Sequence, residues 1–424
     1  MALQDLRPMM ERCSYCAGCK FIPFEKIKSL RFAENCPSIG YYNFMTYSAR
    51  GRFQLSQSLL DGRAQLDDTT TNAIHSCTSC GYCDIGCKIT RYNLEPLEHN
   101  IEQKAYAVEN GKILEGQKPL IDNLKKEHSM IPGTKKANRT DWAKDLNLKD
   151  LFKEKAEVAF FAGCKYSYDP KLQKVAQSAV KLLQSAGVDL GYLGAADNCC
   201  AGRAHQMGFF NEFKDRANAN IKSFETAGVK TIVTPCSDCY HSFKRQYAKL
   251  GSTVKVLHIV EYVDQLIQEG KIKFTKSVPM TVTYHDPCHL GRLGEDYIPW
   301  EGKEKKILNQ VHTWEPKRPR YNGIYGIYDA PRNILKAIPG VNLVEMERIR
   351  EYSWCCGAGA GCNESNPEFS AWTAGERITE ANTTGADALV TACPWCKDNF
   401  VNAVDEDGNK IEVLDIIELV QQAI

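Results

Sequence analysis

The sequence predicts a multidomain fold, in which an all-helical N-terminal domain precedes two pseudo-repeated α/β domains, each with a parallel sheet. Three observations predict this arrangement. A shift of 157 residues, from Cys236 to Cys393, superimposes two Cys-x-x-Cys couplets and the apolar segments on both sides of them. Each apolar segment is short and is followed by a helical pattern, which is typical of βαβ units. Residues 1–110 show helical patterns without strand-like alternation.

The repeated unit contains five cysteines, arranged as one cysteine, an adjacent pair and a Cys-x-x-Cys. The first copy consists of Cys164, Cys199, Cys200, Cys236 and Cys239. The second copy consists of Cys288, Cys355, Cys356, Cys393 and Cys396. Independent disulfides would have no reason to keep this spacing, whereas a duplicated metal-binding module would.

Composition and charge limit the function classes. The chain has 424 residues, 43% hydrophobic and 25% charged, which predicts two or three soluble globular domains. A net charge of +1 gives no electrostatic case for a nucleic-acid partner or a membrane surface. The N-terminus lacks the apolar core of a signal peptide, and no apolar run approaches the roughly 20 residues of a spanning helix. We therefore expect a cytoplasmic protein that reaches a membrane only through a partner.

Nineteen cysteines are unusual for such a chain. A reducing cytosol keeps structural thiols reduced, so dense and patterned cysteine indicates metal sites or redox chemistry. The alternative, a secreted disulfide scaffold, suits a short chain and not one of this length.

The predicted N-terminal domain, residues 1–115, contains two runs of cysteines at intervals of three, which can bind one face of a cubane cluster. In two-cluster ferredoxins the fourth cysteine of each run ligates the other cluster. This rule assigns one [4Fe–4S] cluster to Cys13, Cys16, Cys19 and Cys87. It assigns a second to Cys77, Cys80, Cys83 and Cys36. The sequence departs from the ferredoxin pattern in two places: the gap before Cys36 is long, and Lys88 replaces the proline after Cys87. A zinc ribbon is the alternative interpretation of these cysteines. Helices are expected over residues 43–60 and 95–110.

Residues 116–155 are polar and contain Pro132-Gly133, which predicts a linker. Its basic residues, interpreted as a solvated surface, are Lys125, Lys126, Lys135, Lys136 and Arg139.

Each α/β domain, residues 156–275 and 276–424, is expected to deliver cysteines from the carboxyl ends of its strands, where α/β sheets place their sites. Strands are predicted at 158–161, 232–234 and 281–285. Asp169-Pro170 predicts an N-cap and a proline in the first turn of the next helix.

The second repeat contains an insertion at about residues 293–323. It carries large aromatic residues, Tyr297, Trp300, Trp314 and Tyr321, among several lysines and arginines. One interpretation is an ordinary surface loop. The other is a lid or docking arm that controls what reaches the second cysteine set, since exposed aromatic residues usually pack against something.

Three strings give the sequence a family resemblance: Asp286–Arg292, Tyr328–Arg332 and Cys355–Gly359. They resemble the cysteine-rich CCG domains of heterodisulfide reductase subunits, fused to a two-cluster ferredoxin-like domain. The layout is also similar to iron–sulfur subunits of glycerol-3-phosphate, glycolate and lactate dehydrogenases, and to electron-transfer subunits of anaerobic benzoyl-CoA reductase complexes.

The resemblance implies a non-cubane [4Fe–4S] cluster at each five-cysteine set, beside the two cubane clusters. The first copy departs from the family string, because Ala201 follows the cysteine pair where the second copy has Gly357. Zinc or an altered cluster is therefore an alternative at the first site. Cys362 has no counterpart and is expected to be a buried bystander.

The resemblance further implies an iron–sulfur oxidoreductase subunit of an anaerobic complex. It would pass single electrons through the cubane clusters to the non-cubane clusters, for disulfide or thiolate redox chemistry, with flavin- or iron–sulfur-containing partner subunits. His285 and His289 flank Cys288 and are candidate catalytic proton donors, with His205 weaker; each could equally be bonded to backbone. The alternative functions are a pure electron relay to a flavin, quinone or benzoyl-CoA reductase-type partner, and a zinc-stabilised scaffold.

Overall fold

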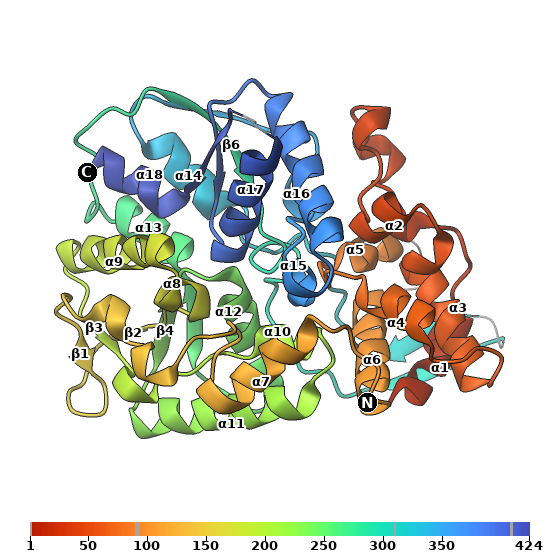
Figure 1. The fold of residues 1–424 in the computed structure, drawn as a ribbon. Helices are drawn as coiled ribbons and strands as arrows, with labels where there is room; N and C mark the ends of the chain where they lie inside the picture. Colours follow the sequence, from red (N-terminus) through yellow and green to blue (C-terminus); the bar gives the residue numbers. More distant parts are fainter. Residues whose placement is uncertain (1, 90–93, 309–310, 408–409) are drawn as a thin grey trace.

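The computed structural model describes residues 2–89, 94–308, 311–407 and 410–424. Figure 1 shows an N-terminal helical region, in red and orange, beside two α/β regions that carry the rest of the chain. The buried core of the α/β half is continuous across both sheets.

The N-terminal region is built from short helices. They are α1 (Arg7–Glu11), α2 (Pro37–Tyr42), α3 (Ala49–Leu60), α4 (Asp68–His75), α5 (Tyr82–Lys88) and α6 (Pro96–Glu109). The helix expected over 95–110 is confirmed as α6, with Gly111 in the left-handed conformation after it. The helix expected over 43–60 begins later, because Ser48 caps α3 by accepting a hydrogen bond from the Gly51 amide.

Both sheets are parallel, as predicted. The first has the order β1 (Lys149–Asp150), β3 (Leu190–Tyr192), β2 (Val158–Phe160), β4 (Thr231–Thr234) and β5 (Lys255–His258). The second has the order β9 (Val341–Val344), β6 (Met280–His285), β10 (Ala388–Thr391) and β11 (Glu412–Asp415). The shift that relates Cys236 to Cys393 also carries β4 onto β10 and β5 onto β11, with the first and last residues of each pair of strands matching.

The helices of the two α/β regions follow their strands along the chain. The first region has α8 (Cys164–Tyr168), α9 (Pro170–Ser185), α10 (Gly202–Gln206), α11 (Phe210–Thr226), α12 (Ser237–His241) and α13 (Ile259–Gln268). The second has α14 (Asp329–Ala337), α15 (Cys362–Ser365), α16 (Pro367–Asn382), α17 (Pro394–Asp407) and α18 (Ile416–Ala423). Asp169 caps α9, whose first residue is Pro170, as the sequence predicts.

The segment expected to be a polar linker differs from that expectation. It forms α7 (Gln117–Glu127), whose Leu120, Ile121 and Leu124 are buried in the α/β core, and it adds β1 to the edge of the first sheet. The helix was hidden by its low overall hydrophobicity, since only one face is apolar.

The insertion forms an antiparallel hairpin of β7 (Lys303–Ile307) and β8 (Val311–Glu315). The hairpin packs on the N-terminal region: Glu304 forms an ion pair with Arg12, and Trp314 lies 5.7 Å from the same guanidinium. Arg318 pairs with Glu95 at 3.3 Å. The insertion is therefore a strap between the two halves of the chain.

Among the described residues, no helix is both long enough and apolar enough to cross a membrane.

Candidate metal centres

The two five-cysteine sets lie at the carboxyl ends of the central strands of each sheet. Cys164 begins α8 just after β2, and Cys236 directly precedes α12 after β4. Cys288 and Cys393 follow β6 and β10 in the same way. Parallel pairing of β2 with β4 and of β6 with β10 brings these strand ends together.

Within each set the thiols form a chain of interacting neighbours with the same order. The first chain runs Cys164, Cys199, Cys200, Cys239 and Cys236. The second runs Cys288, Cys355, Cys356, Cys396 and Cys393. The structure therefore brings together all five predicted residues at each site.

The second cysteine of each pair has a lowered pKa. Hydrogen bonds from Cys199 and Cys239 lower the pKa of Cys200 to about 6. Hydrogen bonds from Cys355 and Cys396 lower the pKa of Cys356 to about 5. Thiolates are the form in which cysteine binds metal, so both sites favour a ligating state.

The alanine that replaces glycine in the first copy does not change the local backbone. Ala201 has φ 54° and Gly357 has φ 93°, so both are left-handed. The Ala201 amide donates to Cys199 Sγ at 3.3 Å, and the Gly357 amide donates to Cys355 Sγ at 3.3 Å. This conformation costs an alanine about 1–2 kcal/mol, yet the first site keeps the loop of the second.

Arg139, expected on a solvated surface, is buried at the first site. Its Nη1 donates to Cys164 Sγ at 3.0 Å, and its Nη2 pairs with Asp197 at 3.3 Å. That expectation was wrong for Arg139 because its partner stands far away in the sequence. Lys136 is also partly buried, and burial lowers its pKa to about 8.

His285 lies at the second site. One of its ring nitrogens and the Sγ atoms of Cys356 and Cys396 lie within 4.8 Å of one another. Arg377 Nε donates to His285 Nδ1 at 3.2 Å, so the proton of the neutral ring is on Nε2. Nε2 is buried without a hydrogen-bond partner among the described residues. Burial, together with the charge of Arg377, holds the pKa of His285 far below its usual value.

The first site has a phenylalanine where the second has His285. Phe161 stands three residues before Cys164, as His285 stands three before Cys288. Phe161 packs edge-on against Phe243, and His285 packs edge-on against Phe400. The two sites thus share packing but differ in one N–H group.

His289 joins the two α/β regions. Its Nδ1 lies 3.1 Å from Asp238 Oδ1 and 3.2 Å from Cys288 Sγ. The pseudo-equivalent pair is Lys165 and Trp395, with the ammonium 5.6 Å from the ring. Each pair connects the residue after a first cysteine with the residue inside the opposite couplet.

Trp395 is also covered by Arg203 of the first region, whose guanidinium lies 3.9 Å from the ring. Arg203 is held by Glu364 at 2.6 Å. Trp395, inside the second couplet, is thus in contact with the first α/β region. By contrast His205 stands away from the cysteines, and its ring packs on Phe210 and Phe213.

The N-terminal cysteines fall into the two groups that the crossing rule predicts. Cys87 interacts electrostatically with Cys19 and Cys13. Cys36 interacts with Cys80 and Cys77, and Cys83 with all three. Cys16 is the exposed member of the first group. Cluster binding by these groups stays a prediction.

The second N-terminal group touches the second five-cysteine set. Cys80 and Cys355 pack in one buried cluster and interact electrostatically, and Thr78 Oγ1 lies 3.3 Å from Cys355 Sγ. Cys362 is buried nearby, with its Sγ 3.9 Å from the His75 carbonyl.

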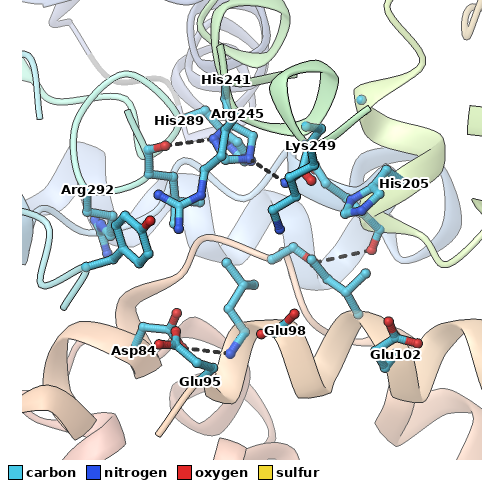
Figure 2. Close-up of a pocket in the computed structure, with 18 of the residues that line it drawn as sticks. Asp84, Glu95, Glu98, Glu102, His205, His241, Arg245, Lys249, His289 and Arg292 are labelled. Atoms are coloured by element: carbon cyan, nitrogen blue, oxygen red, sulfur yellow. Dashed lines mark hydrogen bonds between the residues drawn. The ribbon is translucent and has the colours of Figure 1, made fainter. Parts of the chain in front are cut away.

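A cavity of about 170 Å³ opens between the N-terminal region and both α/β regions. Figure 2 shows the acidic residues Glu98 and Glu102 of α6 and its N-cap residue Glu95 along one side, and Arg245 and Lys249 opposite them. His241, His289 and Arg292 line its inner end, and Tyr321 of the insertion borders it. His289 lines this cavity and also lies 3.2 Å from Cys288 Sγ through its Nδ1.

The donor set fits iron–sulfur clusters. All nineteen cysteines are free thiols, eighteen of them in the four predicted groups. Buried N–H groups of His285 and Arg292 lack acceptors among the described residues beside the second site. Anionic cluster sulfur would accept such hydrogen bonds.

Sequence reasoning missed Arg139, Asp238, Trp395 and Arg203 as residues of the sites. The signals that could have found two of them were the positions of Asp238 and Trp395 inside the couplets.

These sites define an iron–sulfur oxidoreductase subunit with a duplicated CCG cysteine-rich domain. The CCG domain model matches residues 158–244 and 317–400. The chain belongs to this family of heterodisulfide reductase subunits. It is 31% identical to a subunit of the dihydromethanophenazine:CoB–CoM heterodisulfide reductase of Methanosarcina mazei, over 83% of this chain and 78% of that protein.

Two other relatives are longer than the chain. EtfAB:quinone oxidoreductase of Syntrophomonas wolfei is 28% identical over 87% of this chain and 48% of its own length. The probable iron-sulfur-binding oxidoreductase FadF of Bacillus subtilis is 30% identical over 89% and 50%. The chain thus spans about half of these relatives.

The fold also resembles a solved structure, that of a hypothetical protein from Helicobacter pylori. The TM-score is 0.53 at 11% identity, covering 89% of this chain and 67% of the other.

Proposed function

We propose that this chain is the iron–sulfur subunit of an anaerobic redox complex, which carries single electrons from its N-terminal domain to the CCG domains for disulfide or thiolate chemistry. The observation that carries the proposal is the contact between Cys80 and Cys355, since it joins the second N-terminal group to a complete CCG set. Clusters bound at the four groups would supply one-electron transfer.

The exposure of the cysteines supports an order in which electrons enter at the first N-terminal group and pass from the second group to the CCG domains. Cys16 is exposed, and in the same N-terminal region Phe24 and Leu30 are more than nine-tenths exposed. Exposed apolar residues on the N-terminal region suit contact with a partner subunit, which the subunit names of the relatives also support. The contact between Cys80 and Cys355, by contrast, is buried.

A disulfide consumes two electrons and two protons to give two thiols. The cavity lined by Arg245, Lys249 and Glu98 is the space through which a small polar substrate could approach His289 and Cys288. In this proposal His289 and His285 bind and orient groups at Cys288, and the contact with Asp238 fixes the His289 ring.

The test is anaerobic turnover with a reduced viologen dye as electron donor and a series of small disulfides as acceptors. Disulfide-dependent oxidation of the dye, lost in the Cys356→Ser variant, supports the proposal. Normal reduction of bound clusters without consumption of any disulfide contradicts the chemistry.

The electron-relay alternative is favoured by one observation. Trp395, inside the second couplet, is covered by Arg203 of the first region, and these large side chains restrict a substrate that would bridge the two cysteine sets. Two relatives are named for electron transfer to quinone or for iron–sulfur binding, without a disulfide. In the same assay a relay would oxidise the dye with a quinone and with no disulfide.

A further inference from the structure

Arg292 is a buried arginine without an acidic partner among the described residues. It is 2% exposed, and it stands four residues after Cys288. Its Nη2 donates to the carbonyl of Ser353, two residues before Cys355. Its Nε and Nη1 have no hydrogen-bond partner in the part of the chain that the structure describes.

Other buried arginines in the described chain are compensated. Arg139, Arg203, Arg332, Arg348 and Arg377 each form an ion pair with a carboxylate. Arg52 donates to the backbone carbonyls of Ala73, Ser76 and Tyr47. A buried charge without compensation is costly, so the position of Arg292 requires an anion.

The surroundings of Arg292 identify where that anion would be. The guanidinium lies 5.7 Å from the ring of Tyr82, two residues after Cys80. Arg292 therefore lies among residues that stand close in sequence to Cys80, Cys288 and Cys355. Burial opposes its charge, but the sulfurs of Cys80 and Cys288 raise the pKa of Arg292 above its usual value.

The first CCG site has a different electrostatic balance. Its buried arginine, Arg139, is neutralised by Asp197. Arg292 adds an uncompensated positive charge at the second site and at the adjoining N-terminal group.

We propose that Arg292 is a positioning residue that sets the reduction potentials of both groups it joins, the Cys80 group and the second CCG site, by donating hydrogen bonds to their sulfurs. The inference rests on the proposed function and deepens it. A positive charge and N–H donors favour the more negative, reduced state of a cluster, so Arg292 makes both groups easier to reduce.

The test is an EPR-monitored redox titration of the anaerobically purified full chain. Arg292→Gln removes the charge, and Arg292→Lys keeps it. Arg245→Gln is the matched control, since Arg245 lines the same cavity but lies against Tyr321, 3.9 Å from its ring. Iron content and circular dichroism report folding.

Arg292→Gln is expected to move both midpoints to more negative potential. The expected change is at least tenfold in the ratio of reduced to oxidised protein, or about 59 mV for a one-electron couple. Arg292→Lys should move them less, and Arg245→Gln should leave them unchanged.

Unchanged midpoints in an iron-replete Arg292→Gln protein, or an equal shift in Arg245→Gln, would overturn the proposal. If the Arg292→Gln protein loses iron, the Arg292→Lys protein decides the question. An iron-replete Arg292→Lys protein with midpoints near those of the parent supports the proposal, and any other result for this variant overturns it. Missing cluster signals in the parent would instead refute the proposed function itself.

Discussion

The thiol of Cys80 packs beside the thiol of Cys355 and interacts with it electrostatically, although these residues stand in different regions of the chain. The N-terminal region is therefore docked directly on the second CCG set. The first CCG set has no such contact with an N-terminal cysteine in the described chain. This asymmetry leads us to propose the second CCG site as the first recipient of electrons.

Replacing Cys80 with serine should remove one cubane signal and also perturb the signal of the second CCG site. The first CCG signal should not change, because its cysteines lie on the other sheet. EPR of the reduced protein checks this. Cys16→Ser is the matched control, and it should remove a cubane signal without altering either CCG signal. Loss of all signals in Cys80→Ser would show that the domains do not fold separately.

His285→Phe would give the second site the residue that the first has at Phe161. The ring can still pack on Phe400, but the Nε2–H donor is lost. We expect full iron content with a more negative midpoint at the second CCG site. The amide of His285→Gln can accept a hydrogen bond from Arg377 and still donate one, so the midpoint of this variant should lie close to that of the parent. Equal midpoints in all three proteins would exclude a hydrogen bond from His285.

Asp415 couples stability to pH. Burial raises its pKa to about 6 from 3.8, and its carboxylate accepts from the Tyr166 hydroxyl at 2.7 Å. A folded pKa above the unfolded one means that stability is full at low pH and is lost as pH rises from about 4 through about 6. Asp415→Asn keeps the cap without the charge.

Between pH 5 and 7.5, the free energy of unfolding of the parent should therefore fall by about 1 kcal/mol relative to that of Asp415→Asn. Denaturant unfolding of both proteins measures this difference, which cancels effects of pH that they share. A constant difference across this range would contradict the raised pKa.

Shortening the insertion should affect access or partner binding. Replacing residues 299–317 with a Gly-Ser link removes the hairpin but keeps Leu293 and Gly323, which pack at Gly81 and Arg292. Iron content should stay the same, while turnover or partner binding falls. Glu304→Ala, which breaks the ion pair with Arg12 and the contact with His312 but keeps the hairpin backbone, is the control and should have a small effect. If the shortened protein matches the parent in turnover and partner binding, the hairpin has no role in either.

The sequence was sufficient for the repeat and for the strands that carry it. Short apolar runs ending at Cys164, Cys236 and Cys288 are local signals, and the structure has strands at each. The helix cap at Asp169 is local as well. Such features depend on neighbours in sequence, so they could be predicted.

Features that depend on distant partners could not be predicted. Arg139 looked solvated because Asp197, which neutralises it, is 58 residues away. The docking of Cys80 on Cys355 and of Arg203 on Trp395 follows from how domains pack, and neither contact leaves a periodic signal. Low hydrophobicity likewise hid the buried face of α7.

Iron and acid-labile sulfide analysis of the anaerobically purified chain, combined with EPR, tests the central claim most directly. Four groups that each bind a four-iron cluster require about sixteen irons per chain. We predict that value, with two cubane signals and signals from both CCG sites. Saturation near eight irons, with zinc in the remaining sites, would contradict the claim.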